Sequence, residues 1–348
     1  MKSIDLNHSK RTIKIAGECL SGGIKAAESL EEYVSAFRIL DDWRVSHEYP
    51  MQSMLGYFRN KAFEVNSKAI VARRLKRTPS ILAKLSRERG MRLDRIEDIG
   101  GVRIVVSTLK EVEEVVLAIK NGRTRNILRR ERDYISEPKA SGYRGYHLIY
   151  RYNGQKIDRF PFHNVELQIR TLIQHSWATT VEVVGTFTRQ GLKASKGSKK
   201  WLNFFELAGR VLANFEKGSN DESDQSAIDQ LIKNIQELDV LGKLQAYSVT
   251  AKYMNEKPRQ GDKYFMMTLN ADSGAIQVTR FPDLKVARKI YGERELELRE
   301  STSEDVVLVS TESIKSLKLA YPNYFADTTK FRQHLRTIMA NKSQQTNR

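Results

Sequence analysis

The chain has 348 residues, which fits two domains of about 100–200 residues each, and 40% of its residues are hydrophobic, as in a soluble globular protein. Lysine and arginine outnumber aspartate and glutamate by 59 to 42, which favours polyanionic partners such as nucleotides or RNA, with a solvated basic surface as the alternative. The single cysteine, Cys19, excludes an intramolecular disulfide and a thiolate zinc cluster. No segment approaches the ~20 apolar residues that span a bilayer, so we expect a soluble cytoplasmic protein.

The first half of the chain changes from helical to strand-like patterns. Apolar residues recur at helical spacing from Ala26 to about Lys61, and His47 within this region is interpreted as a packing or helix-end residue. The branched residues from Ile99 to Val106 predict a buried strand, and a helix should follow at about 109–120. The arginine-rich run 123–132 fits either a binding surface or a solvated edge.

Two paired strands are predicted at 146–152 and 165–171, because Asn153-Gly154 between them is a turn signature. Helical patterns follow at 172–184 and 200–216. These patterns predict an α+β domain at residues 1–216.

The segment 217–226 is small, polar and acidic, which indicates a linker before a second domain at 227–348. In that domain we predict a helix, a hairpin, and then helical, strand and helical segments, at about 227–247, 264–269 with 275–281, 284–298, 305–310 and 312–319. The predicted second domain is therefore a small α+β module without zinc, because the cysteines for a zinc site are missing.

Cations gather near a predicted helix start at Pro79-Ser80. Arg74, Lys76 and Lys84 lie on either side of it. A helix N-terminus beside lysine and arginine can hold a triphosphate, although a merely basic helix is the alternative.

Asp98 ends a polar turn and is followed by Gly100, Gly101 and Arg103 on the predicted strand. A carboxylate at a strand edge beside glycines can approach Mg²⁺ bound to phosphates. The sequence therefore offers a candidate metal ligand close to the candidate phosphate site.

The strand at 165–171 places Glu166, Gln168 and Arg170 on one face, because side chains alternate along a strand. That polar face fits the floor of an open cleft or an exposed sheet face. The loop 133–147 combines aromatic rings, cations and glycines, and such a loop can stack a base and bind phosphates.

Together these segments resemble the synthetase domain of the RelA/SpoT family of alarmone synthetases over roughly residues 40–190. The family's four motifs occur in order at 74–85, 98–103, 138–144 and 166–171. The resemblance implies a nucleotidyltransferase-like α+β fold, with a mixed sheet flanked by helices, and ATP-dependent pyrophosphokinase activity.

The resemblance also implies roles for individual residues. ATP binding falls to Arg74, Lys76, Ser80, Lys84, Arg103 and Gln168, Mg²⁺ binding to Asp98 and Glu166, and acceptor binding to Lys139, Tyr143, Arg144 and His147. Asp98 and Glu166 are the implied catalytic residues, with Glu166 as candidate base and Tyr143 as the ring that stacks on the acceptor.

Two departures from the family pattern concern the acceptor pocket rather than the ATP site. Gly145-Tyr146-His147 stands where Ser-Leu-His is usual, and Val181-Glu182 replaces the Glu-His expected after Trp177-Ala178.

The added C-terminal module is similar to the toxic branch of the family, which includes the phage-sensing chains called CapRel. That likeness implies a monomer that transfers the diphosphate to the 3′-hydroxyl of the tRNA acceptor end and so blocks translation. Its own C-terminal antitoxin would restrain it, and a phage protein binding that domain would release it.

The candidate regulatory residues are Tyr321, Tyr324 and Phe325, which form either a docking surface or part of the core of the second domain. A (p)ppGpp synthetase acting on GDP or GTP and a catalytically silent RNA- or partner-binding protein are the alternatives.

Overall fold

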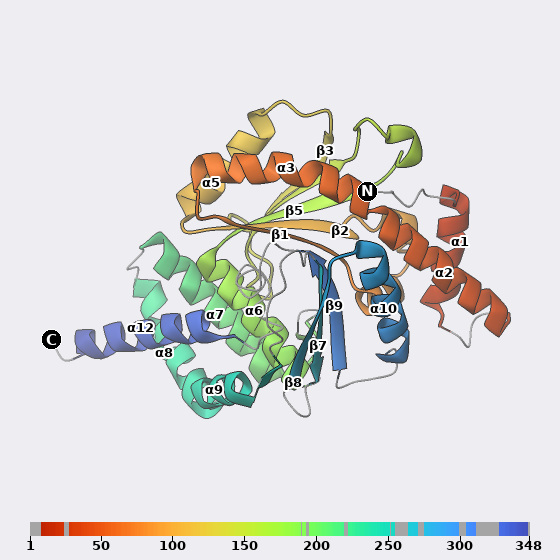
Figure 1. Ribbon diagram of the computed structural model, residues 1–348. Helices are drawn as coiled ribbons and strands as arrows, with labels where there is room; N and C mark the ends of the chain where they lie inside the picture. Colours follow the sequence, from red (N-terminus) through yellow and green to blue (C-terminus); the bar gives the residue numbers. More distant parts are fainter. Residues whose placement is uncertain are drawn as a thin grey trace.

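The computed structural model describes residues 8–23, 28–188, 190–192, 195–218, 222–250, 252–254, 264–270, 275–298, 304–310 and 327–346. These residues form an α+β fold in which a nine-stranded mixed sheet, in the order β3-β4-β5-β2-β1-β9-β7-β8-β6, is flanked by helices (Figure 1). The strands are β1 Ile70–Leu75, β2 Gly100–Val106, β3 Ile127–Asp133, β4 Tyr146–Arg151, β5 Asn164–Thr171, β6 Lys252–Met254, β7 Tyr264–Asn270, β8 Ala275–Phe281 and β9 Glu304–Ser310. The helices are α1 Lys10–Ser21, α2 Leu30–Ser46, α3 Glu48–Val65, α4 Thr78–Arg87, α5 Leu109–Asn121, α6 Leu172–Phe187, α7 Lys199–Lys217, α8 Glu222–Glu237, α9 Val240–Thr250, α10 Leu284–Glu297 and α12 Thr329–Thr346. No described helix is long and apolar enough to cross a bilayer.

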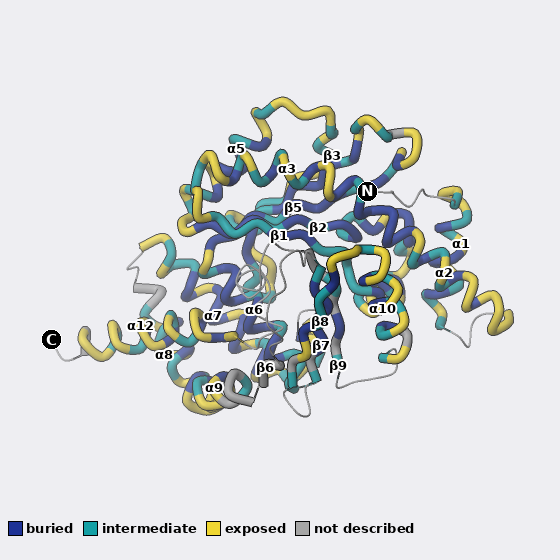
Figure 2. The backbone as a smooth tube through the Cα atoms, in the orientation of Figure 1, coloured by how far each residue is buried: buried dark blue, intermediate teal, exposed yellow. Residues whose placement is uncertain are grey.

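The first half of the sheet confirms the predicted strands and adds two more. β2 and β5 run parallel, and β4 pairs antiparallel with β5, as the turn at Asn153-Gly154 predicts. β1 and the edge strand β3 were not predicted. Helices α3 and α5 cover one face, where branched and aromatic residues pack as a core, while α6 and α7 lie on the other side (Figures 1 and 2).

A second core joins helices from distant parts of the chain. Trp177 of α6, Phe204 of α7, Leu231 of α8 and Leu335 of α12 belong to one buried cluster. The helix predicted at 227–247 is two helices, α8 and α9, and the predicted linker holds the end of α7 and the start of α8.

The C-terminal strands extend the same sheet. The predicted hairpin is present as β7 and β8, and β9 lies between β7 and β1, where Arg73 pairs with Ser310 and Arg74 with Val309. Helix α10 packs on these strands through Ala287. The predicted helix 312–319 and the candidate residues Tyr321, Tyr324 and Phe325 lie outside the described residues.

Candidate active site

A cavity of about 1160 Å³ brings the four motif segments together. Of the predicted ATP, metal and acceptor residues, those that line it are Arg74, Lys76, Lys84, Asp98, Arg103, Lys139, Tyr143, His147, Glu166 and Gln168. Ser80 and Arg144 are not among the lining residues. The polar face of β5 is therefore a cleft floor, and Arg170 lies on it as well.

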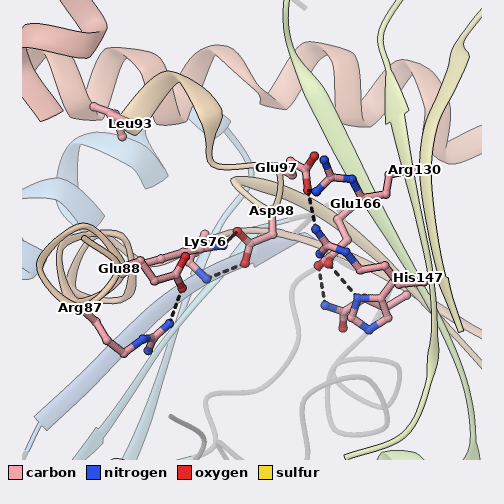
Figure 3. A network of polar contacts seen from close by, with 12 residues as sticks. Lys76, Arg87, Glu88, Leu93, Glu97, Asp98, Arg130, His147 and Glu166 are labelled. Carbon is pink, nitrogen blue, oxygen red and sulfur yellow. Dashed lines mark hydrogen bonds and ion pairs between the residues drawn. The ribbon is translucent and has the colours of Figure 1, made fainter. Parts of the chain in front are cut away.

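The end of the cavity next to α4, here called the phosphate end, is organised around Asp98. Its two carboxylate oxygens accept hydrogen bonds from Lys76 Nζ at 2.6 Å and from Lys84 Nζ at 3.2 Å (Figure 3). Burial acts to raise the pKa of Asp98, but the two ammonium groups outweigh it and hold the pKa well below its usual range. The carboxylate is therefore ionised at neutral pH, and both ammonium groups share it as their ion-pair partner.

The N-terminus of α4 lies where the sequence predicts it, with Pro79 in the first turn, yet it does not open into the cavity. The backbone N–H of Thr78 donates to Glu295 Oε1 at 2.9 Å, and the Thr78 hydroxyl donates to Glu295 Oε2 at 3.0 Å. A side chain of α10 thus occupies the position predicted for a triphosphate.

The other end of the cavity, here called the acceptor end, contains a chain of hydrogen bonds. His147 Nδ1 lies 2.9 Å from Glu166 Oε1, and His147 Nε2 lies 2.5 Å from the Tyr143 hydroxyl, which accepts from Arg170 Nη2 at 2.6 Å. One tautomer satisfies all three contacts: Nδ1–H donates to Glu166, and Nε2 accepts from Tyr143.

The charge states follow from this arrangement. Burial acts to raise the pKa of Glu166, but hydrogen bonds, first of all the one from His147, hold it below its usual value. Burial lowers the pKa of His147 despite the neighbouring Glu166, and burial raises the pKa of Tyr143. At neutral pH the chain therefore consists of an anionic Glu166, a neutral imidazole and a neutral phenol.

The loop that carries Tyr143 is fixed to α7 rather than free. Arg144 is buried and donates to Glu216 Oε2 at 3.0 Å, and Gln174 Nε2 donates to the same oxygen. Gly142 has a φ of +84°, and a Cβ there would lie 2.8 Å from the carbonyl oxygen of Phe205. Arg144, predicted to contact the acceptor, thus points toward Glu216 instead.

Two further walls complete the cavity. Trp177, Val181, Leu192 and Phe205 form an apolar wall beside Tyr143, with Val181 at the position where the family pattern has glutamate. Arg130 and Arg132 of β3 also line the cavity, and both form salt bridges to Glu97 (Figure 3). Part of the arginine-rich run is therefore a cavity wall.

The donor set fits Mg²⁺ bound together with phosphates. Asp98 and Glu166 face the same cavity, and the charge of Asp98 acts to raise the pKa of Glu166. Within the described residues, no group of three or more His, Cys, Asp or Glu side chains is arranged to hold a metal alone. Mg²⁺ commonly takes one or two carboxylates and completes its shell with water and phosphate oxygens.

Sequence reasoning missed Glu216 and Glu295, the two buried carboxylates that hold the walls of the cavity. Glu216 stands out only weakly, as an acidic residue at the end of the apolar helix α7. Glu295 has no local signal, because it belongs to a charged stretch of α10.

Residues 73–185 match the family described as the region found in RelA / SpoT proteins, and this span contains every predicted ATP, metal and acceptor residue. The GTP pyrophosphokinase YjbM of Bacillus subtilis is 40% identical over 115 residues, which are 31% of this chain and 52% of that protein. YwaC, another GTP pyrophosphokinase of that organism, is 35% identical over 112 residues, 30% of this chain and 52% of that protein. This chain spans about half the length of these relatives.

The chain is also similar to solved structures. The small alarmone synthetase 1 from Bacillus subtilis bound to its product pppGpp has a TM-score of 0.44 and 26% identity, over 51% of this chain and 93% of that chain. Residues 73–185 of this chain are therefore similar to the region found in RelA / SpoT proteins.

Proposed function

We propose that this chain is an ATP-dependent pyrophosphokinase that transfers the β,γ-diphosphate of ATP to a hydroxyl group. The observation that carries the proposal is that Asp98 and Glu166 share one cavity, with cations at one end and the Tyr143–His147 pair at the other. The acceptor oxygen forms a bond to the β-phosphorus, the bond from that phosphorus to the α,β-bridging oxygen breaks, and AMP leaves. The matched RelA/SpoT region supports this reaction.

The side chains have separate tasks in this reaction. Lys76 and Lys84 turn from Asp98 to the phosphates and hold them in line. Glu166, kept ionised and oriented by His147, accepts the proton of the attacking hydroxyl. Asp98 and Glu166 would hold Mg²⁺, which supplies charge neutralisation at the phosphates.

The proposed acceptor is the 3′-hydroxyl of the tRNA acceptor end, and its modification blocks translation. The net charge of +17 favours a polyanion with many phosphates over a mononucleotide. Val181 stands where a glutamate is usual, in an apolar wall that also contains Trp177 and Phe205, and such aromatic rings offer surfaces on which a base can stack.

GDP or GTP is the second candidate acceptor. It is favoured by the similarity to proteins named GTP pyrophosphokinase and to a structure bound to pppGpp. Tyr143 would stack on either base, so the stacking ring does not distinguish the two acceptors.

We also propose that the C-terminal half restrains the enzyme until a phage protein binds it. The support is that this half also packs against the cavity: Leu231 of α8 and Leu335 of α12 share a buried cluster with Trp177, which lines it. Tyr321, Tyr324 and Phe325 remain the proposed regulatory residues. Expression of Tyr324→Ala should slow bacterial growth more than the wild type does, and equal growth would count against restraint through this residue.

The acceptor is tested by competition. The full-length protein is incubated with γ-labelled ATP, Mg²⁺, deacylated tRNA and an equal concentration of GDP plus GTP. Label on the tRNA, lost when the terminal 3′-hydroxyl is oxidised with periodate, supports the tRNA acceptor. Label on guanosine nucleotides alone would replace it with the second candidate. No label on either acceptor from the wild type or from Tyr324→Ala, in which the proposed restraint is relieved, would overturn the reaction.

A further inference from the structure

Helix α4 begins with a contact from the far end of the chain. Both polar groups of Thr78, its backbone N–H and its hydroxyl, donate to the carboxylate of Glu295, which lies 217 residues away. Thr78 is 2% exposed and Glu295 is 9% exposed, so solvent does not compete for these hydrogen bonds.

The sequence of α4 leaves this position without a local partner. The cap residue Arg77 makes no side-chain capping bond, and the first turn contains no acidic residue. A helix of ten residues is marginal alone, and its first N–H groups need an acceptor. A carboxylate at this position satisfies an N–H group and interacts favourably with the positive end of the helix dipole.

Glu295 is itself held in one orientation. The Tyr291 hydroxyl donates to Glu295 Oε1 at 2.8 Å, and Arg44 Nη2 donates to Oε2 at 3.3 Å. Arg44 is buried, lies over the Tyr291 ring at 5.1 Å, and also binds Asp41. The carboxylate thus connects α10, α2 and α4 in one buried network.

The same C-terminal region holds the segment before α4. β9 pairs with β1 at Arg73 and Arg74, and α4 begins at Thr78. Lys76 lies between these two points of attachment, and Lys84 lies on α4 itself. Both lysines reach Asp98 in the cavity, so the position of the phosphate-binding cations depends on strand β9 and on Glu295.

We infer that Glu295 is a positioning residue for the ATP subsite, acting through α4 from outside the matched region 73–185. The inference rests on the proposed function, since it concerns the site that would bind ATP. If Glu295 positions the ATP subsite, this part of the C-terminal half supports ATP binding. The proposed restraint by the same half must then act through other contacts. Removal of the whole half would abolish support and restraint together, and single substitutions separate them.

The test measures binding of ATP with Mg²⁺ by titration calorimetry, without an acceptor, to full-length wild type and Glu295→Gln. Loss of a helix cap costs about 1 kcal/mol, so we expect ATP affinity to fall about 5-fold in Glu295→Gln. In turnover assays KM for ATP should rise while KM for the acceptor stays unchanged. Thr78→Val should weaken ATP binding similarly, and Thr78→Ser, which keeps the hydroxyl, should restore it.

Two control variants on α10 sharpen the test. Glu293→Gln removes an exposed charge that pairs only with Lys289 among the described ion pairs, and it should bind ATP as the wild type does. Arg288→Gln removes the α10 contacts to Glu48 and to the Val45 carbonyl without touching α4. If Arg288→Gln weakens ATP binding as much as Glu295→Gln, docking of α10 rather than the cap is responsible, and the inference is wrong. Equal ATP binding by wild type and Glu295→Gln would also overturn it, whereas absence of ATP binding in the wild type would overturn the proposed function instead.

Discussion

The two ends of the cavity hold their functional side chains in different ways. At the phosphate end, the charged Lys76 and Lys84 share one carboxylate, Asp98, and in the proposed reaction they would leave it for the phosphates. At the acceptor end, His147 and Tyr143 form a neutral, buried chain that ends on Glu166. The first end is suited to exchanging one set of charges for another, and the second is suited to keeping a fixed geometry around one carboxylate.

Each end is also anchored by a buried glutamate from outside its own motif. Glu295 of α10 holds the start of α4 at the phosphate end, and Glu216 of α7 holds Arg144 at the acceptor end. Substitutions that weaken one anchor should therefore affect one substrate and leave the other unchanged.

The largest expected effect comes from the two carboxylates in the cavity. Glu166→Gln should reduce turnover about 10²- to 10⁴-fold, as expected for loss of a general base, and it should weaken the dependence of ATP binding on Mg²⁺, which Glu166 would also hold. Asp98→Asn should reduce turnover comparably and weaken the dependence of ATP binding on Mg²⁺, because the amide is a poor metal ligand. Turnover and calorimetric ATP affinity measure both effects, and a Glu166→Gln enzyme with wild-type turnover would exclude Glu166 as the base.

The anchor of the acceptor end should be the next most sensitive. Glu216→Leu leaves the buried Arg144 guanidinium without its carboxylate, and breaking such a pair costs about 3–5 kcal/mol of folding stability. Denaturant unfolding measures this loss. The double variant Arg144→Met with Glu216→Leu should recover most of the stability, and a double variant no more stable than Glu216→Leu would contradict the account.

The third prediction concerns the stability of the fold in acid. Near Gly100, His47 and His163 are fully buried with ring centroids 4.5 Å apart. Burial lowers the pKa of His47 from 6.5 to about 4, so below pH 6.5 the unfolded chain takes up a proton that the folded chain refuses. Stability should therefore fall by about 3 kcal/mol for His47 alone as pH drops from 6.5 to 4. The free energy of unfolding of wild type and His47→Gln, measured in urea across this range, should fall less steeply with decreasing pH in the variant. The same pH dependence in both proteins would contradict the prediction.

The smallest effect should follow from crowding the acceptor loop. A Cβ at Gly209 of α7 would lie 2.5 Å from the carbonyl oxygen of Gly142, so Gly209→Ala pushes the Tyr143 loop away at a cost of about 1–3 kcal/mol. KM for the acceptor should rise while KM for ATP is unchanged. Gly56→Ala in α3, where a Cβ meets nothing within 4 Å, is the control and should leave both KM values unchanged. A rise in KM for ATP in Gly209→Ala would show that the two ends are not independent.

The sequence predicted those parts of the fold in which local pattern and burial agree. β2 was predicted because Ile104, Val105 and Val106 are branched and buried, and the β4–β5 pair because of its turn. β1 was missed because Arg73 and Arg74 interrupt its apolar residues, although Arg73 is buried. β3 was missed because it is a charged edge strand, a position where exposed cations are common.

The candidate site divides in the same way. The predicted ATP, metal and acceptor residues occur in short motifs whose spacing is visible in the sequence. Ten of these twelve predicted residues line the cavity. The residues that hold those motifs in place have partners far along the chain, 72 residues away for Glu216 with Arg144 and 217 for Glu295 with Thr78. No local pattern records such pairs, because they arise only when the helices pack.

The most direct test of the account is an analysis of the products formed by the full-length protein from ATP, Mg²⁺ and deacylated tRNA. Transfer of the β,γ-diphosphate predicts AMP and diphosphorylated tRNA in equal amounts, and formation of both about 10²- to 10⁴-fold slower with Glu166→Gln. Formation of ADP with singly phosphorylated tRNA, or of AMP at an undiminished rate in Glu166→Gln, would contradict the proposed reaction at this cavity.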